Sequence, residues 1–166
     1  MGVGATIELR TDRLVLTTLA VDDASEMVSV LANAELYTFT GGAPPNLSTL
    51  TSRYRTQVAG SGIGDEQWHN WIVRLADTSE AVGFVQATVA AGHADVAWVV
   101  GVRWQGQGIA REAAGAMCQW LRAAGVVAFT AHIHPDHVAS ARVAAALGLE
   151  WTGEVDDESE HLWSAV

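Results

Sequence analysis

Residues Asp95–Leu121 read DVAWVVGVRWQGQGIAREAAGAMCQWL, and a change of pattern within this stretch decides the fold. The first part is rich in β-branched residues and predicts a strand that ends near Val102. The part from Arg111 onward is rich in alanine and repeats its apolar side chains at helical spacing. Gly106 and Gly108 lie between the two parts, where they let backbone N–H groups converge at a helix start that carries about half a positive charge. The stretch therefore predicts an anion-binding turn, suited to phosphate.

Two common nucleotide-binding motifs do not fit this turn. The dinucleotide fingerprint G-x-G-x-x-[GA] starting at Gly106 needs a small residue where Arg111 stands, and no Walker-type G-K-[ST] sequence follows. The pattern [QR]-x-x-G-x-[GA] does fit, from Gln105 to Ala110. On these residues the chain resembles the GNAT superfamily of acyl-CoA-dependent N-acyltransferases.

Other segments extend the resemblance to the ribosomal-protein alanine N-acetyltransferase branch, which is RimJ/RimL-like. Thr11–Leu16 (TDRLVL) is similar to the first strand of that branch, and Asp95–Val100 (DVAWVV) to its fourth strand with an acidic start. Ile133–Ser140 (IHPDHVAS), followed by Leu147–Leu149, resembles its later strand, loop and helix. The resemblance covers nearly all 166 residues.

The resemblance implies an α/β (α+β) GNAT fold, a mixed and mostly antiparallel sheet of about seven strands flanked by about four helices. The hydrophobic patterns agree with it. They predict strands over residues 11–16, 68–75, 82–90, 95–102 and 126–134 with a terminal hairpin, and helices from 23 to 32, after Pro44–Pro45, from 111 to about 125 and from 138 to 147. Asp23 and Glu26 are spaced like a capping box at the start of the first helix.

Length and composition predict one domain over residues 1–166, because 166 residues with 49% hydrophobic content can bury a full core. The apolar stretches are shorter than the roughly 20 residues of a membrane span, and no signal peptide is evident. Met1–Thr6 fits a myristoylation pattern. We interpret that match as a coincidence, because a single lipid anchor binds membranes only marginally and no polybasic patch supports it. No membrane partner is expected.

The charge and the single cysteine limit the partners and the location. Nine arginines, no lysine and nineteen acids give a formal net charge of −10, which argues against nucleic acid as a partner. An acidic surface attracts cationic amines, although it also serves solubility alone. Cys118 excludes an intrachain disulfide and is expected to be a buried structural thiol, which fits a reducing cytoplasm. Whether the chain forms a homodimer is left open.

The family resemblance implies that acetyl-CoA or another acyl-CoA is the acyl donor and that its pantetheine arm lies beside a bulged strand. Gly101 interrupts a β-branched run, as a bulge would, with Val100 and Val102 beside it to bond the arm. The expected cofactor-binding residues are Val100, Gly101, Val102, Gln105, Gly106, Gln107, Gly108, Ile109, Ala110, Arg111, His137 and Ser140. Arg111 is the preferred arginine for phosphate because it starts the helix; Arg103 and Arg142 are weaker candidates.

Direct attack of an amine on a thioester needs a base, and an acid to protonate the departing thiolate. Many GNAT enzymes carry a tyrosine where this chain has Ala144, but the alanine N-acetyltransferase branch resembles this sequence in placing a serine at Ser140. Ser140 is therefore the candidate acid, with helix capping as its alternative role. His137 stands where the family usually has asparagine, so this chain departs from the pattern there.

Three residues are candidates for the general base. Asp95 matches the acidic residue at the start of the family's fourth strand, whereas Glu66 and His69 are expected on the loop that enters the second strand. A histidine needs the least tuning at neutral pH. A chain of water molecules could replace all three, and the sequence does not choose among these alternatives.

No metal is expected. His132 and His134 point to one side of a strand, and His137 follows, but Pro135 and the turn break the convergence that zinc needs. Seven tryptophans are mostly assigned to the core, although Trp68, Trp71 and Trp98 could line a groove for the amine.

The sequence thus predicts an N-acetyltransferase that moves an acetyl group from acetyl-CoA to a primary amine by direct transfer within a ternary complex. The acceptor is either a protein N-terminal α-amine, whose pKa of about 7.7–8.0 suits a weak base, or a small cationic amine. The alternative is a non-catalytic acyl-CoA-binding sensor, which the missing tyrosine would permit.

Overall fold

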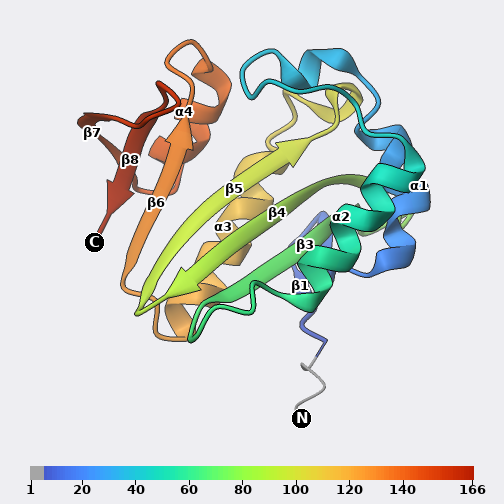
Figure 1. Ribbon diagram of the computed structural model, residues 1–166, viewed down its shortest axis with the longest axis horizontal. Helices are drawn as coiled ribbons and strands as arrows, with labels where there is room; N and C mark the ends of the chain where they lie inside the picture. Colours follow the sequence, from blue (N-terminus) through green and yellow to red (C-terminus); the bar gives the residue numbers. More distant parts are fainter. Residues whose placement is uncertain (1–5) are drawn as a thin grey trace.

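A computed structural model of the chain describes residues 6–166, so the myristoylation pattern, which begins at Met1, lies largely outside the described part. Within that part, one sheet has the strand order β1-β2-β3-β4-β5-β6-β8-β7 (Figure 1). The strands are β1 (Leu9–Arg10), β2 (Leu14–Thr18), β3 (Gln67–Leu75), β4 (Ala81–Ala90), β5 (His93–Val100), β6 (Ala128–Ile133), β7 (Glu150–Val155) and β8 (His161–Ala165). The α-helices are α1 (Ala24–Val30), α2 (Leu47–Ala59), α3 (Ile109–Ala123) and α4 (Val138–Ala146).

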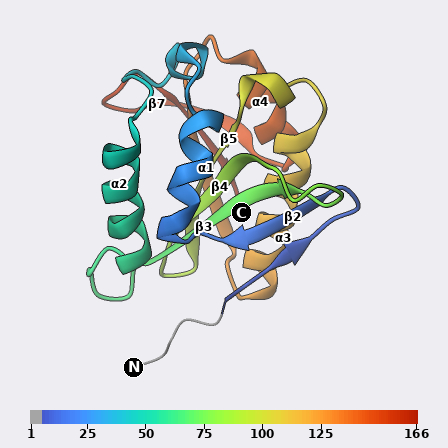
Figure 2. The ribbon, with the colours of Figure 1, turned by 90° about the vertical axis from the view of Figure 1, so that its right-hand side faces the viewer.

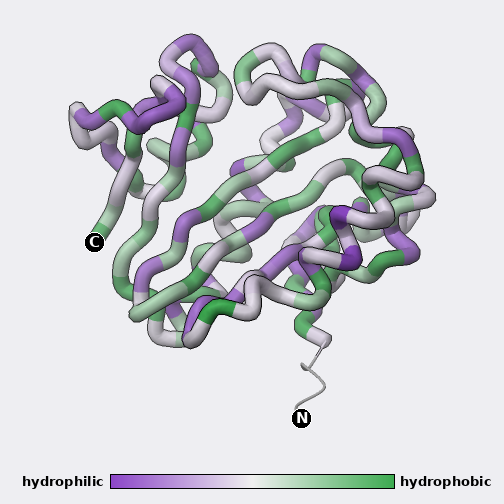
Figure 3. The backbone as a smooth tube through the Cα atoms, viewed as in Figure 1, coloured by the Kyte–Doolittle hydropathy of each residue, from purple (hydrophilic) through white to green (hydrophobic). Residues whose placement is uncertain are grey.

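Helices cover both faces of the sheet. α1 and α2 pack on one face, hereafter the α2 face, and α3 and α4 pack on the other, hereafter the α3 face (Figure 2). Hydrophobic and hydrophilic segments alternate along the central strands, as expected for strands whose successive side chains point to opposite faces (Figure 3). Each face therefore has its own apolar core, one beneath α3 around Met117 and one beneath α1 and α2 around Leu50.

The predicted fold class is confirmed, including the mixed and mostly antiparallel sheet and the four α-helices of residues 6–166. The structure adds an eighth strand, because Leu9–Arg10 folds back onto β2 as the short β1. The first predicted strand, residues 11–16, is shifted to Leu14–Thr18, since residues 11–13 form the turn between β1 and β2.

The expected capping box at the first helix is wrong. Asp23 accepts a hydrogen bond from the Ala20 N–H at 2.8 Å, at the start of a short 3₁₀ turn that precedes α1. Glu26 does not cap a helix: its carboxylate accepts bonds from the Ala81 N–H and from Arg74, both at 2.8 Å. Glu26 therefore ties α1 to the sheet through partners distant in sequence.

β5 and β6 form the parallel pair of the described sheet, and every other pair of neighbouring strands is antiparallel. A parallel pair needs a crossover connection, which here is α3 on the far face of the sheet. This topology brings the turn before α3 to the same edge as the C-terminal ends of β5 and β6.

Candidate active site

The predicted anion-binding turn lies between β5 and α3. A 3₁₀ turn spans Val102–Trp104, and α3 begins two residues before the predicted start. Gly106 and Gly108 have φ angles of 76° and 78°, which residues with a side chain rarely adopt. The first bond of the helix runs from the Glu112 N–H to the Gly108 C=O, so the N–H groups before it lack helical partners. The turn thus has the geometry of an anion site.

Arg13, in the loop before β2, holds this turn against the sheet. Its Nη1 donates to the Gln107 C=O at 3.0 Å, and its Nε donates to the Glu112 carboxylate at 2.8 Å. The Thr11 hydroxyl also donates to Glu112. Burial alone would raise the pKa of Glu112, but the bonds from Thr11 and Arg13 outweigh it and hold that pKa below its usual value. This brace joins residues 99 positions apart, and the sequence analysis missed it.

The bulge predicted at Gly101 is wrong, because Gly101 follows the last residue of β5. Its N–H donates to the Val82 C=O of β4 at 2.8 Å, which continues the sheet bonding by one residue. A Cβ at this position would lie 2.8 Å from the Trp104 ring. The glycine is therefore needed by the tight packing of the turn. Val102, predicted to belong to the strand, lies in that turn instead.

β5 and β6 pair over three residues and then part. The parallel ladder ends at the pair Asp95 and Thr130, and the two strands diverge towards their C-terminal ends (Figure 1). Because backbone groups of successive strand residues point to opposite sides, those of Trp98 and Val100 face the gap rather than β4. The Gln105 side chain already donates to the Val100 C=O at 2.9 Å. The gap is therefore lined by strand backbone, and the sequence analysis, which considered only the side chain of Trp98, did not predict this role for its backbone.

α4 begins beside the diverging end of β6. Its N-cap residue is His137, whose Nδ1 accepts a hydrogen bond from the Ser140 N–H at 3.4 Å. The alternative role considered for Ser140, capping by its own side chain, is therefore wrong. The Ser140 side chain is half-buried. Within residues 6–166 its hydroxyl makes no hydrogen bond to another residue.

His137 serves the structure in a second way. Its imidazole stacks on Phe39, from the loop between α1 and α2, with ring centroids 4.6 Å apart. Burial, with a smaller contribution from His134, lowers the pKa of His137 and so favours the neutral ring that can accept the cap bond. The contact joins the loop over the α2 face to the start of α4.

Asp95 and Glu66, two of the base candidates, belong to the α2 face. The Asp95 carboxylate is half exposed and accepts a bond from the Thr130 hydroxyl at 2.9 Å. Glu66 accepts a bond from the Trp68 Nε1 at 2.9 Å, in the loop that enters β3. Trp68 pairs with Thr88 of β4, and Thr88 pairs with Asp95 of β5. The side chains of Trp68 and Asp95 therefore point to the same side of the sheet, and the carboxylates of Glu66 and Asp95 lie on that side.

His69, the third base candidate, belongs to β3 and not to the loop before it, and it lies on the opposite face. Its ring packs against Trp71 and Trp120, at centroid distances of 5.8 and 5.2 Å, and burial lowers its pKa. Trp71 and Trp98 pack in the core beneath α3; Trp98 is therefore not a groove residue as predicted, whereas Trp71 also lines the cavity on the α2 face. The structure thus places Asp95 and Glu66 on the same face, two strands apart, and His69 on the other.

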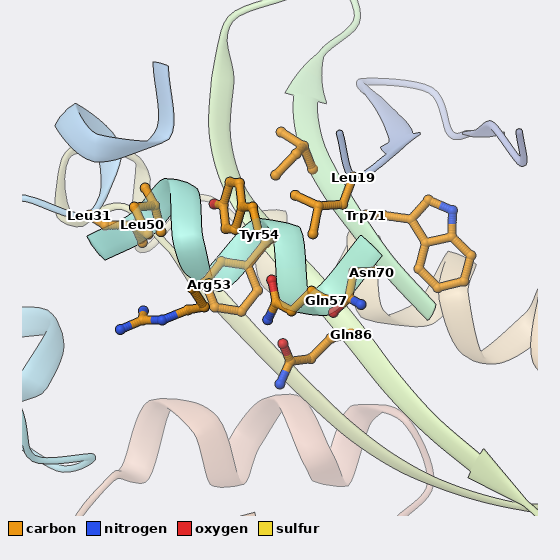
Figure 4. A pocket seen from close by; sticks show the side chains of 11 residues that line it. Leu19, Leu31, Leu50, Arg53, Tyr54, Gln57, Asn70, Trp71 and Gln86 are labelled. Carbon is orange, nitrogen blue, oxygen red and sulfur yellow. The ribbon is translucent and has the colours of Figure 1, made fainter. Parts of the chain in front are cut away.

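A small cavity of about 40 Å³ opens on the α2 face. It is lined by Leu19, Leu31, Leu50, Arg53, Tyr54, Gln57, Asn70, Trp71, Ile72, Phe84 and Gln86. The carboxamides of Gln57, Asn70 and Gln86 lie close together in it, and Arg53 points away from them at its edge (Figure 4). The buried Tyr54 hydroxyl has no hydrogen-bond partner among the described residues, and burial raises the pKa of Tyr54 to about 12. The cavity therefore offers several hydrogen-bonding groups to a bound molecule.

The three arginines considered for phosphate differ in their surroundings. Arg111 is exposed on the first turn of α3, and Arg142 is exposed on α4. Arg103 lies 3.7 Å from the Glu80 carboxylate, with its guanidinium over the Trp104 ring. Arg103 is thus held by local partners, whereas Arg111 stands beside the anion-binding turn.

Two further features of residues 6–166 concern metals and membranes. No group of three or more His, Cys, Asp or Glu side chains in this part could hold a metal ion. No helix there combines the length and apolar character that crossing a bilayer requires. Cys118 is fully buried, as predicted, and burial raises the pKa of its thiol to about 11.

Several solved structures share this fold along nearly the whole chain. An acetyltransferase (GNAT family) from Bacillus anthracis superposes with a TM-score of 0.79 at 15% identity, covering 96% of this chain and 98% of that one. The ribosomal L7/L12 alpha-N-protein acetyltransferase RimL gives a TM-score of 0.78 at 13% identity, with 99% and 95% covered. The microcin C7 self immunity acetyltransferase MccE, solved with acetyl-CoA and AMP, gives 0.77 at 18% identity, with 94% and 93% covered.

Sequence comparison agrees with the fold. No curated protein sequence matches the chain. The family model described as Acetyltransferase (GNAT) domain matches residues 13–150, which include the glycine turn, both diverging strands and α4. The chain therefore belongs to the GNAT acetyltransferase domain family.

Proposed function

We propose that this protein transfers an acetyl group from acetyl-CoA to a primary amine by direct attack within a ternary complex. The observation that carries the proposal is the parting of β5 from β6 directly beside the glycine turn at the start of α3. One feature suits the phosphates of CoA and the other suits its extended arm, and they adjoin each other.

The donor binds through backbone groups in this proposal. The CoA pyrophosphate accepts hydrogen bonds from the N–H groups of residues 106–110, since the Gln105 N–H already donates to the Val102 C=O, and it is neutralised further by Arg111. The pantetheine arm lies in the gap, where the backbone groups of Trp98 and Val100 bond it much as a neighbouring strand would. An N–H group of β5 also polarises the thioester carbonyl as its oxyanion develops. The brace from Arg13 keeps the turn in its binding geometry.

Ser140 protonates the departing CoA thiolate. Its hydroxyl is available because His137, not Ser140, caps α4. Asp95 and Glu66 are the carboxylates that face the acceptor side, where their negative charge attracts the acceptor ammonium. His69 is left out because it faces the core beneath α3.

We infer that the acceptor amine is the α-amine of a peptide or protein. The cavity on the α2 face offers three carboxamides, which can hydrogen-bond both the C=O and the N–H groups of a peptide backbone. Arg53 at its edge would repel a polycation such as a polyamine. RimL, which shares the fold at 13% identity, is named as an alpha-N-protein acetyltransferase. The acidic surface favours a positively charged N-terminus over an anionic acceptor.

The test is to incubate the protein with acetyl-CoA and a panel of amines, with product masses as the readout. The panel contains peptides with free and blocked N-termini, polyamines, amino sugars and free amino acids. We expect acetylation of peptides with a free N-terminus and none of their blocked counterparts. Preferred acetylation of a polyamine or amino sugar would overturn the peptide assignment, and CoA binding without any product would identify an acyl-CoA sensor instead.

A further inference from the structure

His132 lies between two carboxylates at the point where β5 and β6 part. Its Nδ1 is 2.8 Å from Oδ2 of Asp156, in the turn between β7 and β8. Its Nε2 is 3.6 Å from Oδ1 of Asp95. His132 is two residues, about 6.6 Å of strand, beyond Thr130 of the last paired rung. The imidazole therefore stands at the closed end of the gap, where the arm of a bound thioester would end.

The surroundings of Asp156 fix the tautomer of the neutral imidazole. Oδ1 of Asp156 accepts the N–H groups of Glu158 and Glu160, at 2.9 and 2.8 Å, so this oxygen is occupied by the turn. The other oxygen, Oδ2, is left for His132, and an ionised carboxylate can only accept a hydrogen bond. The neutral ring must then carry its proton on Nδ1. This leaves the Nε2 lone pair uncovered and turned towards Asp95.

His132 is also aligned with the cavity on the α2 face. Asn70 pairs with Gln86, and Gln86 pairs with Ala97, along one row across the sheet. His132 stands opposite Ala97 across the gap, because Asp95 pairs with Thr130 and both strands run in the same direction. Only the small side chain of Ala97 lies between the carboxamides and the imidazole in this row. A molecule held by the carboxamides would reach Nε2 without an obstacle from the sheet.

We propose that His132 is the general base of the transfer, with Asp156 as the residue that positions it. This inference rests on the proposed function and names a base that no motif indicated. Nε2 takes one proton from the acceptor ammonium, and the imidazolium that forms lies between the carboxylates of Asp156 and Asp95. The neutral amine nitrogen then attacks the thioester carbon, a C–N bond forms and the C–S bond breaks. The second amine proton passes to the CoA sulfur through Ser140, and the proton on His132 returns to water.

Other charged groups face His132 from the surrounding elements and enter any pH dependence. Asp95 comes from β5. His93, also from β5, is connected to Asp95 through the Thr130 hydroxyl, which lies 3.0 Å from the His93 Nε2 and donates to the Asp95 carboxylate. Asp156 and Glu160 come from the turn between β7 and β8, and the charges of Asp156 and Glu158 raise the pKa of Glu160 beyond the effect of its burial. His134 lies just after the end of β6 and is also close to Glu160.

Two substitutions separate a base from a structural histidine. His132→Gln removes the base, and we expect it to lower kcat/KM at least 100-fold and to remove one ionisation from the pH profile. Asp156→Asn keeps a hydrogen bond but must direct its NH₂ group at His132, because the N–H groups of Glu158 and Glu160 hold the oxygen in place. The proton of the ring then moves to Nε2, so Asp156→Asn should lose the same ionisation. Asp157→Asn is the matched control, since it changes the same charge in the same turn at an exposed residue.

A second measurement does not depend on turnover. The ¹⁵N chemical shifts of the His132 ring report its tautomer, and we expect a proton on Nδ1 in the unmodified protein and on Nε2 in Asp156→Asn. A proton on Nε2 in the unmodified protein would overturn the proposal. So would full activity and an unchanged pH profile in His132→Gln while the unmodified protein acetylates an amine. Failure of the unmodified protein to acetylate any amine would instead overturn the proposed function, and the role of His132 with it.

Discussion

Gly108→Val tests the anion-binding turn at its most constrained point. Gly108 has a φ of 78°, where a residue with a side chain carries about 1–3 kcal/mol of strain. Crowding adds little, because a Cβ there would meet Arg13 Nη2 at 3.5 Å, an ordinary contact. If the turn keeps its shape, the free energy of unfolding falls by that amount, which lowers the melting temperature by roughly 2–12 °C. If the turn relaxes, its N–H groups move away and the Kd for CoA rises about 5-fold to 150-fold.

Calorimetry measures both quantities on the same protein, CoA binding by titration and stability by thermal unfolding. The strain must appear in the stability, in the affinity or divided between them. Gly115→Ala is the matched control, because Gly115 lies inside α3 with open space around it. That change should leave CoA affinity intact and stabilise the helix by up to about 1 kcal/mol. A Gly108→Val protein with unchanged stability and unchanged Kd would refute the argument for this turn.

Four further predictions concern α4 and α3. Ser140→Ala should lower kcat by up to about 100-fold with an unchanged melting temperature, because Ser140 does not cap α4; a lower melting temperature with full turnover would contradict this assignment. His137→Ala should lower the free energy of unfolding by about 0.5–2 kcal/mol in denaturant titrations, whereas His137→Asn retains a capping side chain and should cost less. Because burial lowers the folded-state pKa of His137, stability should be lost as the pH falls below about 6.5, and a His137→Asn protein should lose less; equal losses in both proteins would exclude His137 as the cause. Cys118 should resist thiol reagents at pH 8 until the protein unfolds, since burial raises its pKa to about 11, and rapid labelling of the native protein would show that α3 opens locally.

The parts of this protein that could be predicted from the sequence are those set by local pattern. The glycines of the turn after β5 and the alanine-rich repeat of α3 carried enough signal to predict a strand, an anion-binding turn and a helix in that order. Gly101 was misjudged because a glycine in a β-branched run has two explanations. Its actual neighbour, the Trp104 ring, is three residues further along a turn whose path the pattern does not reveal.

The position of His69 could have been predicted. His69, Trp71 and Val73 alternate along one strand, so they share a face, and the apolar Trp71 and Val73 predict that this face is part of a core. The partners of Glu112 and His132 had no such signal. Arg13 and Asp156 reach them from other elements of the fold, so their meeting depends on strand register and on crossover geometry.

Because β5 and β6 pair over three residues, fewer strand hydrogen bonds hold the sheet together at this pair than between its long central strands. On one side of it, strands β1 to β5 form one panel, and on the other side β6, β8 and β7 form a second, smaller one. Beyond Asp95 and Thr130, the panels are joined through the helices behind them and not by strand hydrogen bonds. A molecule lying in that seam would add the missing rungs, so its release would soften the whole protein. The free energy of unfolding of this protein would then rise with the concentration of its donor.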